Sequence, residues 1–306
     1  METLIEVKNL TKDYGQGRGV FDVSFYVKKG ECFGFLGPNG AGKSTTIRHI
    51  MGFSIPDKGE TLLRGLGSDT KREDLMYKVA YVPGEVAMPL NLTGQEIIDE
   101  QIALKGVKDL SRLNYLMEYF EVDPTLEAKD MSLGMKRKIA LVCAFSDDPD
   151  IVILDEPSSG LDIDMQAKFI DYILELKKQG KTILLSSHMF SEVDACCDRI
   201  AIIKDGHIVA NFDSASLKHN SRKEYFVYFN NIDDLNNFIA NVNNLNYECK
   251  VDRDNLMVDI YTYDDTINEF IKILAKSKVK DFKEKKETLE EFFMSFYKED
   301  LKYESI

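Results

Sequence analysis

The chain has 306 residues, and its 39 basic and 52 acidic side chains give a net charge of −13. At roughly 150 residues per domain, this length predicts about two domains. A composition of 44% hydrophobic and 30% charged residues is typical of globular proteins and excludes disordered and fibrous chains. The acidic balance argues against broad contact with phosphate backbones, so we expect no nucleic-acid partner.

No apolar run approaches the roughly 20 residues that cross a bilayer, since the longest, Ile139–Phe145 and Ile151–Leu154, have the size of core segments. The charged N-terminus lacks the apolar stretch of a signal peptide, and we expect a cytoplasmic protein. The five cysteines are odd in number and have no C-x-x-C spacing, which predicts reduced core thiols.

Residues 1–212 alternate between short apolar runs and helical patterns, beginning with Cys32–Leu36. Residues 165–179 carry a helical stripe of apolar side chains. This alternation predicts an α/β domain in which helices cover a largely parallel sheet. The expected strands are Cys32–Leu36, Val79–Val82, Ile151–Leu154, Thr182–Leu185 and Ile200–Ile203.

Near Asn211 the sequence becomes polar, and residues 211–223 are expected to form a linker or winding surface connection. We therefore place a small α+β domain at residues 213–306. Its expected elements, in chain order, are a strand at 225–229, a helix at 233–241, strands at 247–251 and 256–261, a helix at 264–276, a strand at 279–283 and a helix at 288–298. The order β-α-β-β-α-β favours a ferredoxin-like unit, and Thr288 with Glu291 fits a capping box that starts the last helix.

The most specific motif is the segment Gly37–Ser44, which fits G-x-x-x-x-G-K-[ST] between an apolar strand and a helix. Its glycines let backbone N–H groups turn toward one anion, and the helix start adds its positive dipole end. Lys43 would reach the β- and γ-phosphates of a nucleotide, and the Ser44 hydroxyl would hold Mg²⁺. A merely structural strand-to-helix turn would need neither the lysine nor the hydroxyl.

A second motif ends the apolar run Ile151–Leu154 with two adjacent carboxylates, Asp155 and Glu156. Two such groups repel each other and resist desolvation, a cost that a divalent cation relieves. Because successive strand residues point to opposite sides, Asp155 would face the metal and Glu156 would polarise the attacking water. The alternative is an ordinary exposed strand end.

A third segment, Ser132–Met135, opens a helical run. Ser132 is a good N-cap, which alone explains the serine. Gly134 lies in the first turn, where glycine costs about 1 kcal/mol relative to alanine. We interpret the missing side chain as room for an anionic group at the helix start.

Together these motifs resemble the P-loop nucleotide-binding subunit of ATP-binding cassette (ABC) transporters over roughly residues 2–212. The resemblance identifies Gly37–Ser44 as Walker A, Ile151–Glu156 as Walker B, Ser132–Met135 as the signature, Ser158–Asp162 as the D-loop and His188 as the switch histidine. It implies catalytic roles for Glu156, His188 and Lys43, and Mg²⁺ ligation by Ser44 and Asp155. The residues that would contact ATP are Tyr14, Gly37, Pro38, Asn39, Gly40, Ala41, Gly42, Lys43, Ser44, Thr45, Ser132, Gly134 and Asp162.

Some of these residues have simpler explanations. Tyr14, expected to stack on adenine, fits a half-buried strand-end tyrosine, and His188 fits a satisfied histidine beside a strand. Ser159 and Asp162 are also common turn formers.

Two positions depart from the family pattern. Leu133 and Met135 replace the first glycine and the glutamine of Leu-Ser-Gly-Gly-Gln, and Gly84 stands where the Q-loop carries glutamine. Either Glu85 or water substitutes for that glutamine, or the coupling to a membrane partner is looser. Such changes favour the export-type subset of the family.

The resemblance implies that ATP and Mg²⁺ are bound between two such domains, in a homodimer or in a heterodimer with a related subunit. A separate transmembrane permease subunit would dock on a groove around Tyr81–Gln101, where Thr93 and Glu96 cap the start of a helical subdomain. The chain would then lie on the cytoplasmic face of the cell membrane. The alternatives are a soluble regulatory ABC-type ATPase not coupled to transport and a cassette acting on nucleic acid or the ribosome. Peptides, drugs and lipids all remain open as substrates.

Overall fold

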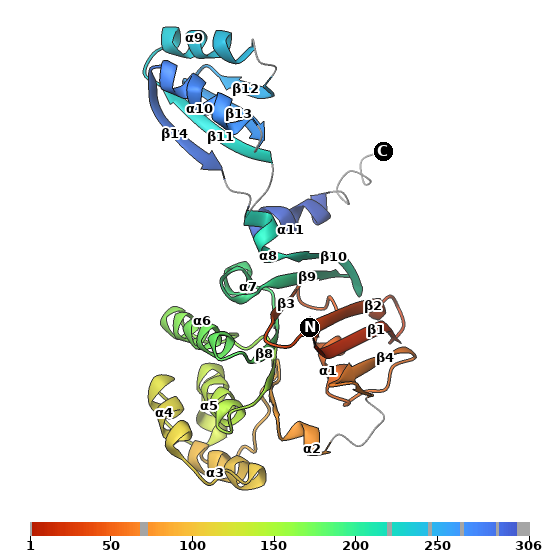
Figure 1. Cartoon of the computed structure of the whole chain (residues 1–306). Coiled ribbons are helices and arrows are strands. Elements are labelled where there is room, and N and C mark those ends of the chain that lie inside the picture. The colour runs from red at the N-terminus through yellow and green to blue at the C-terminus, as the bar shows by residue number, and fades with distance from the viewer. Residues whose placement is uncertain are drawn as a thin grey trace. The chain divides into compact units, whose positions relative to one another are not determined.

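The computed structural model describes residues 2–67, 73–218, 222–243, 247–263, 266–285 and 288–298. The chain divides into two compact units, Met1–Ser214 and Ala215–Ile306, called unit 1 and unit 2 below. Figure 1 shows the elements of each unit.

The central sheet of unit 1 has six strands in the order β10-β9-β3-β8-β7-β6. Neighbours from β9 to β6 are parallel, while β10 is antiparallel to β9. All residues of β3, β7 and β8 are buried, as expected for apolar runs that are covered on both faces. The prediction of a largely parallel sheet is confirmed, with strands β3 (Cys32–Leu36), β6 (Val79–Val82), β7 (Ile151–Asp155), β8 (Thr182–Ser187), β9 (Arg199–Lys204) and β10 (His207–Asp213).

The register of the neighbouring strands β3, β8 and β7 places their carboxyl ends side by side. Leu36 pairs with Ser187, and Asp155 pairs with Ser186. The residues that follow these strands therefore start from one edge of the sheet.

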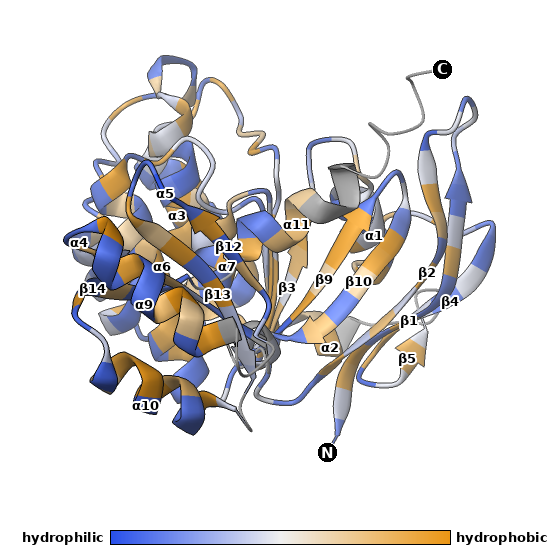
Figure 2. Cartoon of the chain, turned by 90° about the horizontal axis from the view of Figure 1, so that it is seen from above, coloured by the Kyte–Doolittle hydropathy of each residue, from blue (hydrophilic) through white to orange (hydrophobic). Residues whose placement is uncertain are grey.

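Unit 1 also contains a second, antiparallel sheet that the sequence analysis did not predict, in the order β2-β1-β4-β5. Its strands alternate between polar and apolar residues, visible as alternating blue and orange in Figure 2. The buried residues of these strands, such as Val7 and Val23, pack in one core cluster with residues of the central sheet such as Phe33. The strands are β1 (Thr3–Asp13), β2 (Gly19–Lys28), β4 (Lys58–Leu63) and β5 (Leu66–Gly67).

The helices of unit 1 cover the central sheet and form a helical subdomain, in which α3 and α4 pack against α5. The predicted capping box of Thr93 and Glu96 starts α3. The elements are α1 (Lys43–Ile50), α2 (Glu73–Met76), α3 (Gly94–Lys105), α4 (Ser111–Tyr119), the 3-10 helix η1 (Ala128–Asp130), α5 (Leu133–Phe145), α6 (Ile163–Lys178) and α7 (Phe190–Cys196).

Unit 2 is built around an antiparallel sheet in the order β12-β13-β11-β14, and α9 and α10 contribute to its core cluster. Its elements follow one another in the order that the sequence predicted, and the capping box of Thr288 and Glu291 is present. They are β11 (Arg222–Phe229), α9 (Ile232–Asn243), β12 (Cys249–Asp252), β13 (Met257–Tyr263), α10 (Ile267–Lys276), β14 (Val279–Lys285) and α11 (Leu289–Lys298), with α8 (Ser214–Lys218) preceding them.

The linker expected at 211–223 is wrong at both of its ends. Residues 211–213 complete β10, where Asp213 pairs with Arg199, and residues 222–223 begin β11. The polar sequence reflects an edge strand whose side chains alternate between exposed and half-buried positions. Residues 219–221 lie outside the described part of the chain, as do residues 264–265 of the predicted helix 264–276.

All five cysteines are free thiols, and four are buried. Burial raises the pKa of Cys143 to about 12, which leaves this thiol unreactive. The expectation of reduced core cysteines is confirmed for these four, whereas Cys249 is half-buried. Among the described residues, we find no helix whose length and apolar character would let it span a bilayer.

Candidate active site

The loop Gly37–Ser44 connects the buried strand β3 to helix α1, as the motif predicted. Gly42 precedes the helix with φ 110°, and a Cβ there would stand 2.6 Å from Val20 Cγ1, so both backbone and packing require glycine. Ala41 is buried, whereas Pro38, Asn39, Gly40 and Ser44 are exposed and Thr45 is half-buried. No side chain caps the start of α1, so its first N–H groups remain available to an anion.

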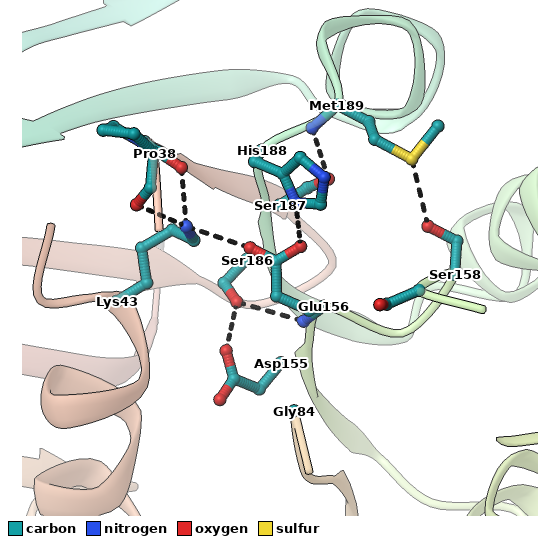
Figure 3. A network of polar contacts seen from close by, with 12 residues as sticks. Pro38, Lys43, Gly84, Asp155, Glu156, Ser158, Ser186, Ser187, His188 and Met189 are labelled. Carbon is teal, nitrogen blue, oxygen red and sulfur yellow. Dashed lines mark hydrogen bonds and ion pairs between the residues drawn. The ribbon is translucent and has the colours of Figure 1, made fainter. Parts of the chain in front are cut away.

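Lys43 lies beneath this loop with only 5% of its surface exposed. Its ammonium donates to the carbonyl oxygens of Gly37 at 2.5 Å and Pro38 at 3.1 Å. It also forms an ion pair with Glu156 Oε1 at 2.9 Å. One cation therefore joins the loop after β3 to the residue after β7, as Figure 3 shows.

Asp155 is the last residue of β7 and is 2% exposed. Its Oδ1 accepts a hydrogen bond from the Ser186 hydroxyl at 2.6 Å. The adjoining Glu156 amide donates to the Ser186 carbonyl at 3.1 Å. Ser186 thus fixes the position of both acidic residues, a role that the sequence analysis missed.

Strand alternation does not separate the two acids, contrary to the sequence-based argument. The strand ends at Asp155, and Glu156 adopts a left-handed conformation with φ 49°. This region costs a non-glycine residue of order 1–3 kcal/mol, and such strain concentrates at functional sites. The turn directs the Glu156 carboxylate toward Lys43 and His188.

His188 follows β8, and its Nδ1 lies 2.5 Å from Glu156 Oε2. The histidine side chain is 45% exposed, whereas that of Glu156 is 15% exposed. Lys43, Glu156 and His188 therefore form a continuous polar chain at the carboxyl edge of the sheet (Figure 3). The structure brings together the three residues to which the sequence assigned catalysis.

The segment after β6 closes another side of this site. A Cβ at Gly84 would stand 2.9 Å from Asp155 Oδ2, so the backbone passes too close to that carboxylate for a side chain. Burial, reinforced by Asp155, raises the pKa of nearby Tyr81 to about 12. Glu85, one of the expected substitutes for glutamine, is exposed.

The donor set around Asp155 suits Mg²⁺, which prefers hard oxygen ligands and often takes only one or two from protein. The buried carboxylate of Asp155 and the exposed hydroxyl of Ser44 supply such oxygens, and α1 packs against β7. Among the described residues, no cluster of three or more His, Cys, Asp or Glu side chains forms a cage for a metal. The site therefore fits a cation that takes one or two oxygen ligands from the protein and others from a bound phosphate.

The signature segment and the D-loop meet each other. Ser132 caps α5 through the Met135 amide at 3.2 Å, and Asp162 caps α6 through the Met165 amide at 2.9 Å. A Cβ at Gly134 would stand 2.6 Å from the Gly160 carbonyl oxygen. This close approach explains Gly134 within one chain, without the anionic group that the sequence analysis invoked.

In the described part of the chain, no hydrogen bond or ion pair joins Ser132, Gly134, Asp162 or Tyr14 to the Lys43–Glu156–His188 chain. Tyr14 directly follows β1 and is 51% exposed. Its contact with nucleotide, and those of Ser132, Gly134 and Asp162, stay predictions.

Two buried charged residues near the site were not foreseen, Arg137 on α5 and Glu192 on α7. Arg137 lies in a Lys-Arg-Lys run that is typical of a solvated helix face, so the sequence gives no sign that this arginine is buried. Glu192 follows the switch histidine by four residues, and only its 1% exposure in the structure distinguishes it from a surface carboxylate.

Comparison with known proteins agrees with this geometry. Residues 20–159 match the family model described as ABC transporter. The chain is 33% identical to the Nod factor export ATP-binding protein I of Burkholderia orbicola (strain AU 1054), over 67% of this chain and 69% of that protein. It is 36% identical to the linearmycin resistance ATP-binding protein LnrL of Bacillus subtilis (strain 168), over 68% of each chain.

Among solved structures, an ATP-binding subunit of an ABC transporter superimposes with a TM-score of 0.64 and 32% identity, covering 70% of this chain and 92% of that one. A dimeric ATP-binding cassette in a post-hydrolysis state, bound to ADP and Pi, shares the fold with a TM-score of 0.62 and 23% identity, covering 69% of this chain and 99% of that one. The chain therefore belongs to the ATP-binding subunits of ABC transporters, and unit 1 carries an ABC ATPase domain.

Proposed function

We propose that this chain binds ATP with Mg²⁺ and hydrolyses it to power an exporter whose transmembrane subunit is a separate chain. The observation that carries the catalytic part is the Lys43–Glu156–His188 chain, with Asp155 beside it at the same sheet edge. The export part rests on the names of the relatives, which are a Nod factor export protein and a linearmycin resistance protein.

In this proposal the N–H groups of the loop Gly37–Ser44 and the Lys43 ammonium bind the β- and γ-phosphates. Mg²⁺, held by Ser44 and Asp155, would neutralise charge on those phosphates. Glu156 accepts the proton of the water that attacks the γ-phosphorus, while the bond to the ADP oxygen breaks. His188, 2.5 Å from Glu156, orients that carboxylate toward the water.

A dimer completes the nucleotide site in this account. The N-terminal end of α5 carries the exposed Ser132 and offers N–H groups and a positive dipole end to the γ-phosphate of an opposing copy. One neighbour of the same fold is dimeric. The partner is either a second copy or a related subunit.

A groove of about 350 Å³ beside β6 supports docking of a transmembrane subunit. Its lining is mostly apolar and comes from β6, the loop after it, α3 and α5. We assign the groove to a cytoplasmic helix of the membrane partner, which would place the chain at the cytoplasmic face of the membrane. The lining residues are Val79, Tyr81, Pro83, Val86, Ala87, Met88, Pro89, Ile97, Gln101, Lys105, Ile139, Ala140, Cys143 and Ala144.

Purification from detergent-solubilised membranes of the source cells tests this assignment. A tagged chain should retain a multi-spanning membrane protein in stoichiometric amount, and Ala140→Arg in the groove should release it. The control Leu104→Arg places the same charge at an exposed position of α3 outside the groove and should retain it. Retention of RNA or ribosomal protein instead, or of no partner, would overturn the transport assignment and favour a soluble ATPase.

A further inference from the structure

Arg137 is among the largest side chains that are completely buried, with 1% of its surface exposed. It projects from α5, five residues after the signature serine. Nη1 donates to the Pro83 carbonyl at 2.5 Å and Nη2 donates to the Gly84 carbonyl at 2.6 Å. Nε reaches the Ser159 carbonyl at 3.4 Å. One planar guanidinium thus joins α5 to the segment after β6 and to the D-loop.

The partners of this cation are unusual for a buried charge. Its hydrogen bonds go to backbone carbonyls, and no carboxylate of the described residues forms an ion pair with it. Burial lowers the pKa of Arg137, while the negative charges of Asp155 and Glu156 oppose that effect. Removing a charge from water is costly without a paired anion, so an apolar side chain would fill this space more cheaply. The guanidinium therefore has a task other than filling the core.

Two of the carbonyl groups that Arg137 binds belong to residues whose backbone lies close to Asp155 or Glu156. Gly84 is the residue whose missing Cβ would stand 2.9 Å from Asp155 Oδ2. Ser159 follows Glu156 by three residues, and its amide donates to the Glu156 carbonyl at 3.2 Å. A shift of either backbone segment would therefore displace the surroundings of Asp155 or Glu156.

We propose that Arg137 is a positioning residue for ATP hydrolysis, which holds the Pro83–Gly84 segment against Asp155 and the D-loop against Glu156. Pro83 also lines the groove, as do Ile139 and Ala140, which follow Arg137 by two and three residues on α5. Arg137 thus joins a segment that lines the groove to the backbone beside the two carboxylates. This inference rests on the proposed ATPase function of the site.

The test compares Arg137→Lys and Arg137→Gln with the parent in the full chain. Lysine keeps the charge but loses the fork of donors, and glutamine keeps hydrogen bonding without charge. Three quantities are measured: Tm, kcat with KM for ATP, and the ratio of affinities for a fluorescent ATP analogue with Mg²⁺ and with EDTA. We expect kcat to fall about 10- to 100-fold with KM nearly unchanged, because displacing a reacting group by about 1 Å has an effect of that size. The affinity ratio should fall severalfold.

Arg199→Lys is the matched control. Arg199 is also buried, but it pairs with Glu31 at 2.8 Å and lies over the Phe33 ring, outside the site. This control should lower Tm while leaving kcat per folded molecule and the affinity ratio unchanged. Parent-like kcat and affinity ratio in both Arg137 variants would overturn the inference, as would losses no larger than those of Arg199→Lys. If Arg137→Gln does not fold, Arg137→Lys decides. A parent without ATP turnover would refute the proposed function instead, and the affinity ratio would still decide the role of Arg137.

Discussion

The Nδ1 atom of His188 lies 2.5 Å from Oε2 of Glu156, while the other oxygen of the same carboxylate lies 2.9 Å from the Lys43 ammonium. The two contacts hold the carboxylate from opposite sides, and its backbone is held in a left-handed turn. The orientation of Glu156, which follows β7, is therefore fixed by residues that follow two other strands, β3 and β8.

His188→Ala should lower kcat for ATP by about 10- to 100-fold, because the Glu156 carboxylate loses the partner that orients it. KM should change little, since Lys43 and the loop Gly37–Ser44 remain. Steady-state ATPase assays measure both quantities. The control His207→Ala removes an exposed histidine that stacks on Phe21, and it should behave like the parent. Parent-like turnover in His188→Ala would show that the contact is only structural.

Lys43→Ala should weaken ATP binding by at least about tenfold, because charge-assisted hydrogen bonds to phosphate are among the stronger polar contacts. Titration with a fluorescent ATP analogue measures the loss. Lys12→Ala removes a lysine that pairs with Asp57 at 2.8 Å and should leave the affinity unchanged. Equal affinities of parent and Lys43→Ala would remove Lys43 from the binding site.

Gly134→Ala should displace the D-loop, since the new Cβ would stand 2.6 Å from a backbone oxygen of Gly160. We expect a lower Tm and a loss of turnover. Lys136→Ala, two residues further along the same helix, adds no such contact and should keep both. A Gly134→Ala protein with the Tm and kcat of the parent would show that the signature segment and the D-loop separate easily.

Glu192 should make the stability of the protein depend on pH. Burial raises the pKa of this carboxyl from its ordinary 4.5 to about 7. The nearby hydroxyls of Ser158 and Ser187 offset only a small part of that effect, because neither forms a hydrogen bond of good geometry with the carboxylate. Between about pH 4.5 and 7 the folded state therefore binds more protons than the unfolded state, and the free energy of unfolding falls as pH rises, by about 3 kcal/mol in total.

Glu192→Gln cannot ionise, so this fall should disappear and the variant should be more stable than the parent at pH 8. Urea unfolding at pH 5, 6, 7 and 8 measures the difference. Glu118→Gln, which removes an exposed carboxylate of α4, should follow the parent curve. Parallel curves for the parent and Glu192→Gln would show that Glu192 is ionised in the folded protein.

The part of the fold that the sequence predicted best consists of continuous apolar runs. Cys32–Leu36 and Ile151–Leu154 are recognisable because strands buried on both faces are made mostly of apolar residues. The sheet of β1, β2 and β4 was missed because only half of its residues are apolar. The alternating burial of Gly19–Lys28 is the signal that could have revealed it.

The candidate site could be predicted where the chemistry depends on residue type, as for Lys43, Asp155, Glu156 and His188. It could not be predicted where only three-dimensional packing gives a residue its role. Nothing in a Lys-Arg-Lys run shows that Arg137 is the buried member. A glutamate at position 156 also does not predict a left-handed backbone, which asparagine or glycine would adopt more readily.

The most direct test of the account compares ATP binding and turnover in the parent and in Glu156→Gln, by calorimetry with Mg²⁺ and by steady-state assay. We predict that both proteins bind ATP with affinities within about threefold, and that turnover in the variant falls by at least about 100-fold, since the proton acceptor is lost. Failure of the parent to take up ATP, or hydrolysis by Glu156→Gln at the parent rate, would contradict the account.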